Sequence, residues 1–269
     1  MAYKVSEEYK KVIYSGEANH DLYVEYGGEV LKEASSRISN LRWVRKILSN
    51  GNKYFSLDNF IAQNIELIFY DYEVQDLTKE FYFKLGTMVN GKYEYVPIGY
   101  YQIKDNPTTA NGKTTYKLID RSKNFDFNYD SSKVIEQNGG SATFLQIVED
   151  ICAIAKVELA SKNFPGYNKK TSFYDNTLTG RIHISSIAEK CGCIATINRE
   201  GKLQFIEINK NKIDVKEIPE LIINEKMSIG DKYKISKVSF DSGTILWNFG
   251  DDSADTLYIN STNLYITKE

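Results

Sequence analysis

Two histidines, three cysteines and an acidic turn are the residues whose types could support catalysis or metal binding in this sequence. His20 and His183 are far apart, and neither has a metal-ligand partner at a useful spacing, so we expect His183 on a helix surface or at an interface. Cys191 and Cys193 flank one glycine, but a zinc knuckle requires a second ligand pair, which is missing. The two thiols span a predicted helix end and strand start, so we expect their sulfurs to point into different surroundings.

The acidic turn near the C-terminus contains Asp251, Asp252 and Asp255. A calcium loop of the EF-hand kind needs alternating oxygen ligands, a central glycine and a final glutamate. Ser253 and Ala254 interrupt the alternation and no glutamate follows, so the pattern favours a turn between strands.

Covalent catalysis requires a base beside a serine or cysteine nucleophile. The chain has no Gly-x-Ser-x-Gly elbow and no glycine-rich phosphate loop. Among its 36 acidic residues, no pair stands out in an apolar setting. We therefore expect no catalytic residue, no cofactor, no metal site and no enzymatic activity.

Composition indicates a folded protein of ordinary core size. Of 269 residues, 42% are hydrophobic and 26% charged, which excludes a disordered chain. The net charge of −2 and the lack of a basic block argue against sequence-specific nucleic-acid binding. The 20 tyrosines favour sheets and suit subunit interfaces, because the ring is buried while the hydroxyl finds a partner.

The cysteines and the hydropathy pattern indicate the cellular compartment in which the chain is made. Three cysteines are too few for a disulfide framework, and Cys152 and Cys191 lie on predicted apolar helix faces, which suits a reducing cytoplasm during synthesis. The N-terminus has no apolar signal segment, and no run of about 18 apolar residues predicts a membrane span.

The first 120 residues read as one helix followed by strands. Ser6 can cap a short helix that stops at Gly16. A hairpin follows around Gly27-Gly28, and further turns are expected at Asn90-Gly91 and Asn111-Gly112. The predicted strands are residues 22–26, 29–31, 40–48, 64–70, 81–86, 93–101 and 114–119, a pattern typical of a sandwich or barrel.

Residues 143–208 read as two helices and a hairpin. Thr143 and Gln146 form a capping box at the first helix. Its apolar stripe is wide enough to predict a helix clamped between two partners; it comprises Phe144, Leu145, Ile147, Val148, Ile151, Cys152, Ile154 and Ala155. The second helix runs from near Thr179 to Gly192, with an apolar face of Ile184, Ile187, Ala188 and Cys191. Gly201 supplies the positive φ of the hairpin turn.

Composition shifts divide the chain into three predicted domains. Residues 1–130 form a β domain, 131–225 an α+β module, and 226–269 the beginning of a second β domain. The polar stretch 126–140 is the first boundary, and 213–229, with Pro219, is a connector. Strands at 235–240, 244–249 and 257–259 are too few to close a barrel. The fold class is α+β, predominantly β.

Three stretches together resemble the tail hub proteins of tailed bacteriophages, prophages and tail-like bacteriocins. The first is NKYFSLDNFI at 52–61 with YVPIGY at 95–100. The second is ATFLQIVEDIC at 142–152, continuing through Phe164-Pro165, then IAE at 187–189 and NREGKL at 198–203. The third is ISKVSF at 235–240 with FGDD at 249–252. The resemblance rests on the order of these stretches, which spread over most of the chain.

The resemblance implies a tail-tube-like β-barrel, an α+β module and a second tube-like barrel. It implies a baseplate or tail-tip hub that forms a homotrimer in the virion tail, after assembly in the host cytoplasm. The implied partners are the tail tube or distal tail protein, the tape measure protein and the tip or spike protein. Family members usually continue well past the position of Glu269, so the second barrel is expected to be incomplete.

Two other functions stay open at this point. The chain can be the N-terminal hub part of a tail-associated peptidoglycan hydrolase, or a carbohydrate-binding β module in which exposed Trp and Tyr stack on sugar rings. Peptidoglycan release would identify the first, and glycan binding the second.

Overall fold

The computed structural model describes residues 3–16, 18–31, 38–45, 60–71, 73–207, 235–240, 245–248 and 255–259. The fold is α+β and predominantly β, as the sequence predicts. The described residues fall into two compact units. Unit 1 lies within Met1–Val44 and Asn64–Asp120, and unit 2 within Arg45–Gln63, Arg121–Lys210 and Asp231–Glu269. The three-domain division at 1–130, 131–225 and 226–269 stays a prediction.

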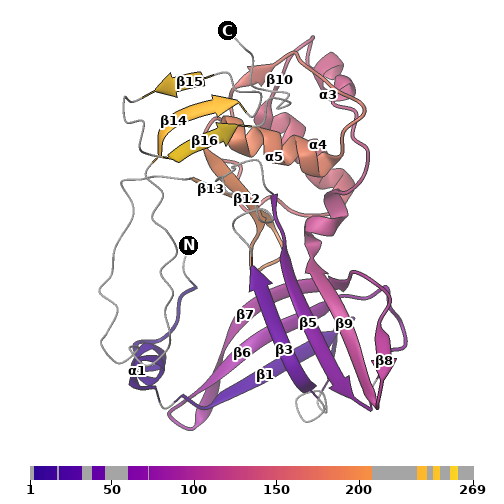
Figure 1. The fold of residues 1–269 in the computed structure, drawn as a ribbon, viewed down its shortest axis with the longest axis vertical. Helices are drawn as coiled ribbons and strands as arrows, with labels where there is room; N and C mark the ends of the chain where they lie inside the picture. The colour runs from indigo at the N-terminus through magenta and orange to yellow at the C-terminus, as the bar shows by residue number, and fades with distance from the viewer. Residues whose placement is uncertain are drawn as a thin grey trace. The chain divides into compact units, whose positions relative to one another are not determined.

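The described part of unit 1 consists of one eight-stranded sheet and the helix α1 (Figure 1). The strand order is β2-β1-β6-β7-β9-β5-β3, with β8 beside β9, and this path is open in the described part of the chain. Barrel closure therefore stays a prediction. The elements are α1 (Glu7–Ser15), β1 (His20–Tyr26), β2 (Glu29–Val30), β3 (Ile38–Arg45), β5 (Gln63–Tyr70), β6 (Phe81–Val89), β7 (Lys92–Ile103), β8 (Thr108–Ala110) and β9 (Lys113–Asp120).

The hairpins of unit 1 turn where the sequence predicts. Gly28, Gly91 and Gly112 have φ of 88°, 79° and 68°, the left-handed region that glycine enters at low cost. Each predicted strand in this unit is confirmed, although residues 46–48 of the predicted 40–48 strand lie outside the described residues.

Alternation along the strands of unit 1 places one set of side chains in a common core. In β5, Ile65, Leu67 and Phe69 are buried while the residues between them are half-buried. The other large core side chains are mostly aromatic: Tyr26, Phe81, Phe83, Tyr101 and Tyr116.

The described part of unit 2 contains the two predicted helices and three small sheets. One sheet has the order β13-β12-β4, with β4 parallel to β12; another pairs β10 with β11; the third has the order β15-β14-β16. The elements are β4 (Phe60–Ile61), η1 (Arg121–Phe125), α3 (Ser132–Gln137), β10 (Ala142–Thr143), α4 (Phe144–Ala155), β11 (Lys170–Thr171), α5 (Gly180–Lys190), β12 (Cys193–Ile197), β13 (Leu203–Glu207), β14 (Ile235–Phe240), β15 (Ile245–Asn248) and β16 (Asp255–Ile259).

Helices α4 and α5 of unit 2 begin where the sequence predicts. Thr143 and Gln146 form the reciprocal capping box at α4, and Thr179 Oγ1 accepts the Ile182 N–H at α5. Gly192, just past α5, has φ 65°, and Gly201 in the β12–β13 turn has φ 77°. The strands predicted after residue 230 are present as β14, β15 and β16. A second tube-like barrel stays a prediction.

The apolar stripe of α4 is narrower than predicted. Phe144, Ile147 and Val148 are buried, but Leu145 is only partly buried and Ile154 is 52% exposed. At about 100° per residue, Ile154 lies at the edge of the buried stripe, beside Ile147, in the last turn of the helix. The helix is therefore open on one side instead of clamped on two. Cys191 is likewise only partly buried.

The stretch 126–140, predicted as a polar boundary, contains a helix with a core contact. Val134 and Ile135 of α3 are buried in the same cluster as Phe144 and Ile147 of α4. The stretch therefore contributes to the core of unit 2. Among the described helices, none is long and apolar enough to cross a membrane.

Candidate interaction site on unit 1

The outward face of β1, β6 and β7 carries a group of tyrosines around one lysine. Strand alternation sends Val24, Phe83 and Tyr101 inward, so their neighbours in the chain point the other way. The register then places Tyr23 opposite Lys84, Tyr82 opposite Tyr100 and Gly86 opposite Tyr95. We call this set the tyrosine face: Tyr23, Tyr82, Lys84, Tyr95 and Tyr100.

The rings of the tyrosine face pack on one another and on the ammonium group. Tyr82 and Tyr100 stack with centroids 4.3 Å apart, and Tyr23 meets Tyr95 edge to face at 5.7 Å. Lys84 Nζ lies 4.5 Å from the centre of the Tyr23 ring and 5.0 Å from that of Tyr82. Each such cation–π contact contributes about 0.5–1 kcal/mol at an exposed site. The face is therefore an ordered, half-buried surface.

Tyr95 is held in place by a carboxylate and a glycine. Its hydroxyl donates to Asp21 Oδ2 at 2.6 Å. This bond, followed by desolvation, raises the pKa of Tyr95 to about 12, so the hydroxyl remains protonated near neutral pH. The ring lies over Gly86, where a Cβ would come within 2.7 Å of it. Gly86 thus makes room for the ring.

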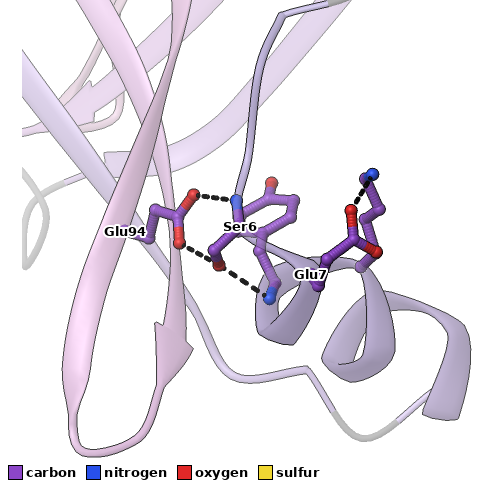
Figure 2. Close-up of polar contacts among 5 residues, drawn as sticks. Ser6, Glu7 and Glu94 are labelled. Atoms are coloured by element: carbon purple, nitrogen blue, oxygen red, sulfur yellow. Dashed lines mark hydrogen bonds and ion pairs between the residues drawn. The ribbon is translucent and has the colours of Figure 1, made fainter.

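The N-terminal segment, residues 3–15, is tied to β7 by one pair of hydrogen bonds (Figure 2). We call this segment the N-terminal arm. The Ser6 backbone N–H donates to Glu94 Oε1 at 2.9 Å, and the Ser6 hydroxyl donates to Glu94 Oε2 at 2.6 Å. Ser6 Oγ also accepts the Tyr9 N–H at 3.0 Å and so caps α1. We call the Ser6–Glu94 pair the clasp.

The clasp favours the ionised carboxylate. Two hydrogen bonds to its oxygens, from the Ser6 hydroxyl and then the Ser6 N–H, lower the pKa of Glu94. The neighbouring Glu7–Lys10 ion pair, at 2.6 Å, is exposed and belongs to α1 alone. It does not attach the helix to the sheet.

Apart from the clasp, the arm is loosely packed. No residue of α1 is buried; Tyr9 and Val12 are half-buried, while Ile13 is 37% and Tyr14 57% exposed. The helix lies beside β6. An element with so little buried surface opens at low free-energy cost.

His20, Cys191 and Cys193, for which we expect no catalytic or metal-binding role, are not part of the tyrosine face. His20 begins β1 on the exposed surface, with Nδ1 3.2 Å from Thr87 Oγ1. Cys193 is buried and Cys191 half-buried, and burial raises their thiol pKa values to about 12 and about 11. A thiol with so high a pKa is a poor nucleophile near neutral pH.

His183 is fully buried, so the prediction of a surface or interface position is wrong. Most of α5 is enclosed, and the imidazole meets the Tyr129 ring edge to face at 5.1 Å. Burial lowers the pKa of His183 to about 4, against the opposing pull of Asp175 and Asp130. The ring is therefore neutral near neutral pH.

The acidic turn is mostly outside the described residues. Asp251 and Asp252 fall there, and Asp255 begins β16. Among the residues with described side chains, no group of three His, Cys, Asp or Glu side chains could hold a metal ion.

Sequence reasoning identified Ser6 only as a helix cap and did not single out Glu94. The two residues are 88 positions apart, and no local pattern links them. The abundance of tyrosine was the one sequence signal that pointed toward this face.

No family model and no curated protein matches this sequence. Among solved structures, the 43 kDa tail protein of prophage MuSo2 from Shewanella oneidensis is 15% identical, with a TM-score of 0.48. That match covers 90% of this chain and 72% of the other. A tail protein from Neisseria meningitidis MC58 is 11% identical over 91% of this chain and 72% of its own, with a TM-score of 0.45.

A third similar structure is the Francisella PdpA-VgrG complex in a half-lidded form. It is 10% identical over 91% of this chain and 43% of that chain, with a TM-score of 0.48.

Proposed function

We propose that this chain is a structural hub subunit of a phage-type tail, without enzymatic activity. The observation that carries the proposal is the order of the tail-hub-like stretches and the elements they form. YVPIGY lies in β7 of the large sheet, ATFLQIVEDIC in β10 and α4, and ISKVSF in β14 of the small terminal sheet. A sheet-rich unit thus precedes a helical module and further strands, in the order expected of a hub.

In the proposed role, three copies form a ring between the tail tube or distal tail protein and the tip or spike. The tyrosine face suits such a ring, because aromatic side chains bury large areas and few rotamers are lost. The tape measure protein would end at the same ring. Assembly would take place in the host cytoplasm, and the mature location would be the distal tail.

Localisation within purified tails tests this function. Particles from the producing cells are labelled with a gold-conjugated antibody raised against the chain and imaged by electron microscopy. We expect gold at one end of each tail, and tails without a defined tip when the gene is disrupted and not complemented. Gold along the whole tail, or normal tails without the chain, would contradict the proposal.

Hydrolase activity distinguishes the hub from the tail-associated lysin. On a peptidoglycan zymogram we expect no clearing by the purified chain or by the full product of its gene. Clearing that disappears when a single carboxylate is replaced would favour the lysin function.

One observation favours glycan binding as a second candidate. Trp43 and Tyr70, on strands β3 and β5, are 43% and 45% exposed, and Lys113 Nζ lies 4.9 Å from the Tyr70 ring centre. Exposed aromatic rings of this kind can stack on sugars. Binding on a glycan array that is lost in Trp43→Ala would support this candidate, and its absence would remove it.

A further inference from the structure

We propose that the N-terminal arm is an exchange element, which leaves its own sheet and docks in the same place on a second copy of this chain. The arm is tied at Ser6 and otherwise buries no residue of α1. This goes beyond the hub function and does not depend on it.

The attachment of the arm is strong at one point and weak elsewhere. The clasp makes two charge-assisted hydrogen bonds to a single carboxylate, at 2.9 Å and 2.6 Å. Val5, Tyr9 and Val12 add only half-buried contacts. Local opening therefore requires loss of one residue pair and leaves the aromatic core of unit 1 untouched.

The arm and the first strand of the sheet are fixed separately. Gly16 caps α1 with φ 73°, and Asn19 is fixed to β6 because its carbonyl accepts the Met88 N–H at 2.9 Å. β1 is thus held in the sheet by bonds that do not involve the arm.

The occupant of the vacated place is a second copy, because only another copy carries the same arm. Exchange of identical elements preserves every contact of the closed form, including both clasp bonds, so it costs little beyond the entropy of association. Exchange should therefore increase with protein concentration.

Isotope-mixed cross-linking tests arm exchange in the full chain. Equal amounts of ¹⁴N and ¹⁵N protein are incubated together at high concentration, treated with an amine-reactive cross-linker and digested. The peptide pair followed joins Lys10 of the arm to Lys92 beside Glu94, both of which are exposed. Exchange yields mixed-isotope pairs, and a closed arm yields only same-isotope pairs.

A complementation pair supplies the matched control. The first chain carries Glu94→Ala, so its arm cannot form the clasp on its own sheet. The second chain lacks residues 1–17, so its Glu94 has no arm of its own to bind. We expect Lys10 of the first to cross-link to Lys92 of the second, and a loss of at least severalfold when the armless chain also carries Glu94→Ala. Circular dichroism checks that each variant is folded.

Absence of mixed-isotope pairs together with absence of trans cross-links in the complementation pair overturns arm exchange. Trans cross-links that persist undiminished without Glu94 would also overturn it, because they would show a contact that does not use the clasp. The hub function is tested separately on whole tails, so either proposal can fail alone.

Discussion

The two units of this protein organise their cores in different ways. The core of unit 1 is largely aromatic and lies on one large sheet, whereas that of unit 2 is mainly aliphatic and lies among short helices and strands. In unit 2 helix ends are closed locally: Thr143 caps α4 and Thr179 caps α5. In unit 1, hydroxyls of buried tyrosines form hydrogen bonds with backbone groups that are distant in the sequence.

The distant bonds of unit 1 are specific. Tyr116 Oη accepts the Val74 N–H at 3.0 Å across 42 residues, and the Tyr26 hydroxyl donates to the Asp76 carbonyl across 50. Such bonds form only once the strands are in register. The tyrosine bonds of unit 1 therefore depend on long-range pairing, whereas the caps of α4 and α5 in unit 2 depend on local signals.

The largest expected effect is a loss of stability from a cavity made in one of the two cores. Phe81 is fully buried against Tyr26, and Phe81→Ala should cost about 3–5 kcal/mol, because it leaves a cavity in an aromatic cluster. Ile147→Ala in unit 2 should cost about 2–5 kcal/mol by the same reasoning. Hydrogen exchange should show faster exchange mainly in the unit that carries each change. Equal acceleration in both units would show that they do not unfold separately.

A second effect belongs to unit 2 alone and depends on pH. Since burial lowers the pKa of His183 from 6.5 to about 4, the unfolded chain binds a proton in this window that the folded chain does not. Stability is therefore full above pH 6.5 and falls as the pH is lowered to 4, by about 3 kcal/mol. Denaturant melts of His183→Gln should lose this part of the pH dependence, and His20→Gln should keep it. Identical pH profiles for all three proteins would refute the assignment.

A smaller effect tests the long-range bonds of unit 1. Tyr116→Phe removes the acceptor of the Val74 N–H in a buried place, and an unsatisfied buried donor costs about 1–3 kcal/mol. The conservative change keeps the ring that packs edge to face on Phe69. Chemical denaturation should show the loss. A variant as stable as the parent would mean that water replaces the hydroxyl.

The smallest effect tests the local caps of unit 2. Thr143→Ala removes one half of the capping box and should cost about 1 kcal/mol. Thr177→Ala is a suitable control, since Thr177 is exposed and bonds only within its own turn, to Asp175. A Thr143 effect no larger than the control would weaken the contrast between locally and distantly specified units.

Much of the secondary structure could be predicted because its signals act within a few residues. The capping box at Thr143, the cap at Ser6 and the glycines at 28, 91, 112 and 201 each act through the backbone around them. The order of the stretches also carried the resemblance to tail hub proteins.

Only the tertiary structure decided which residues distant in the sequence are in contact. It paired Phe60 and Ile61 in parallel with Ala195 and Thr196, enclosed His183, and joined Ser6 to Glu94. It also left Ile154 exposed on a helix that the apolar pattern alone would have buried on both sides. These outcomes depend on the packing of segments distant in sequence, and that packing is a sum of many small contacts that no local pattern records.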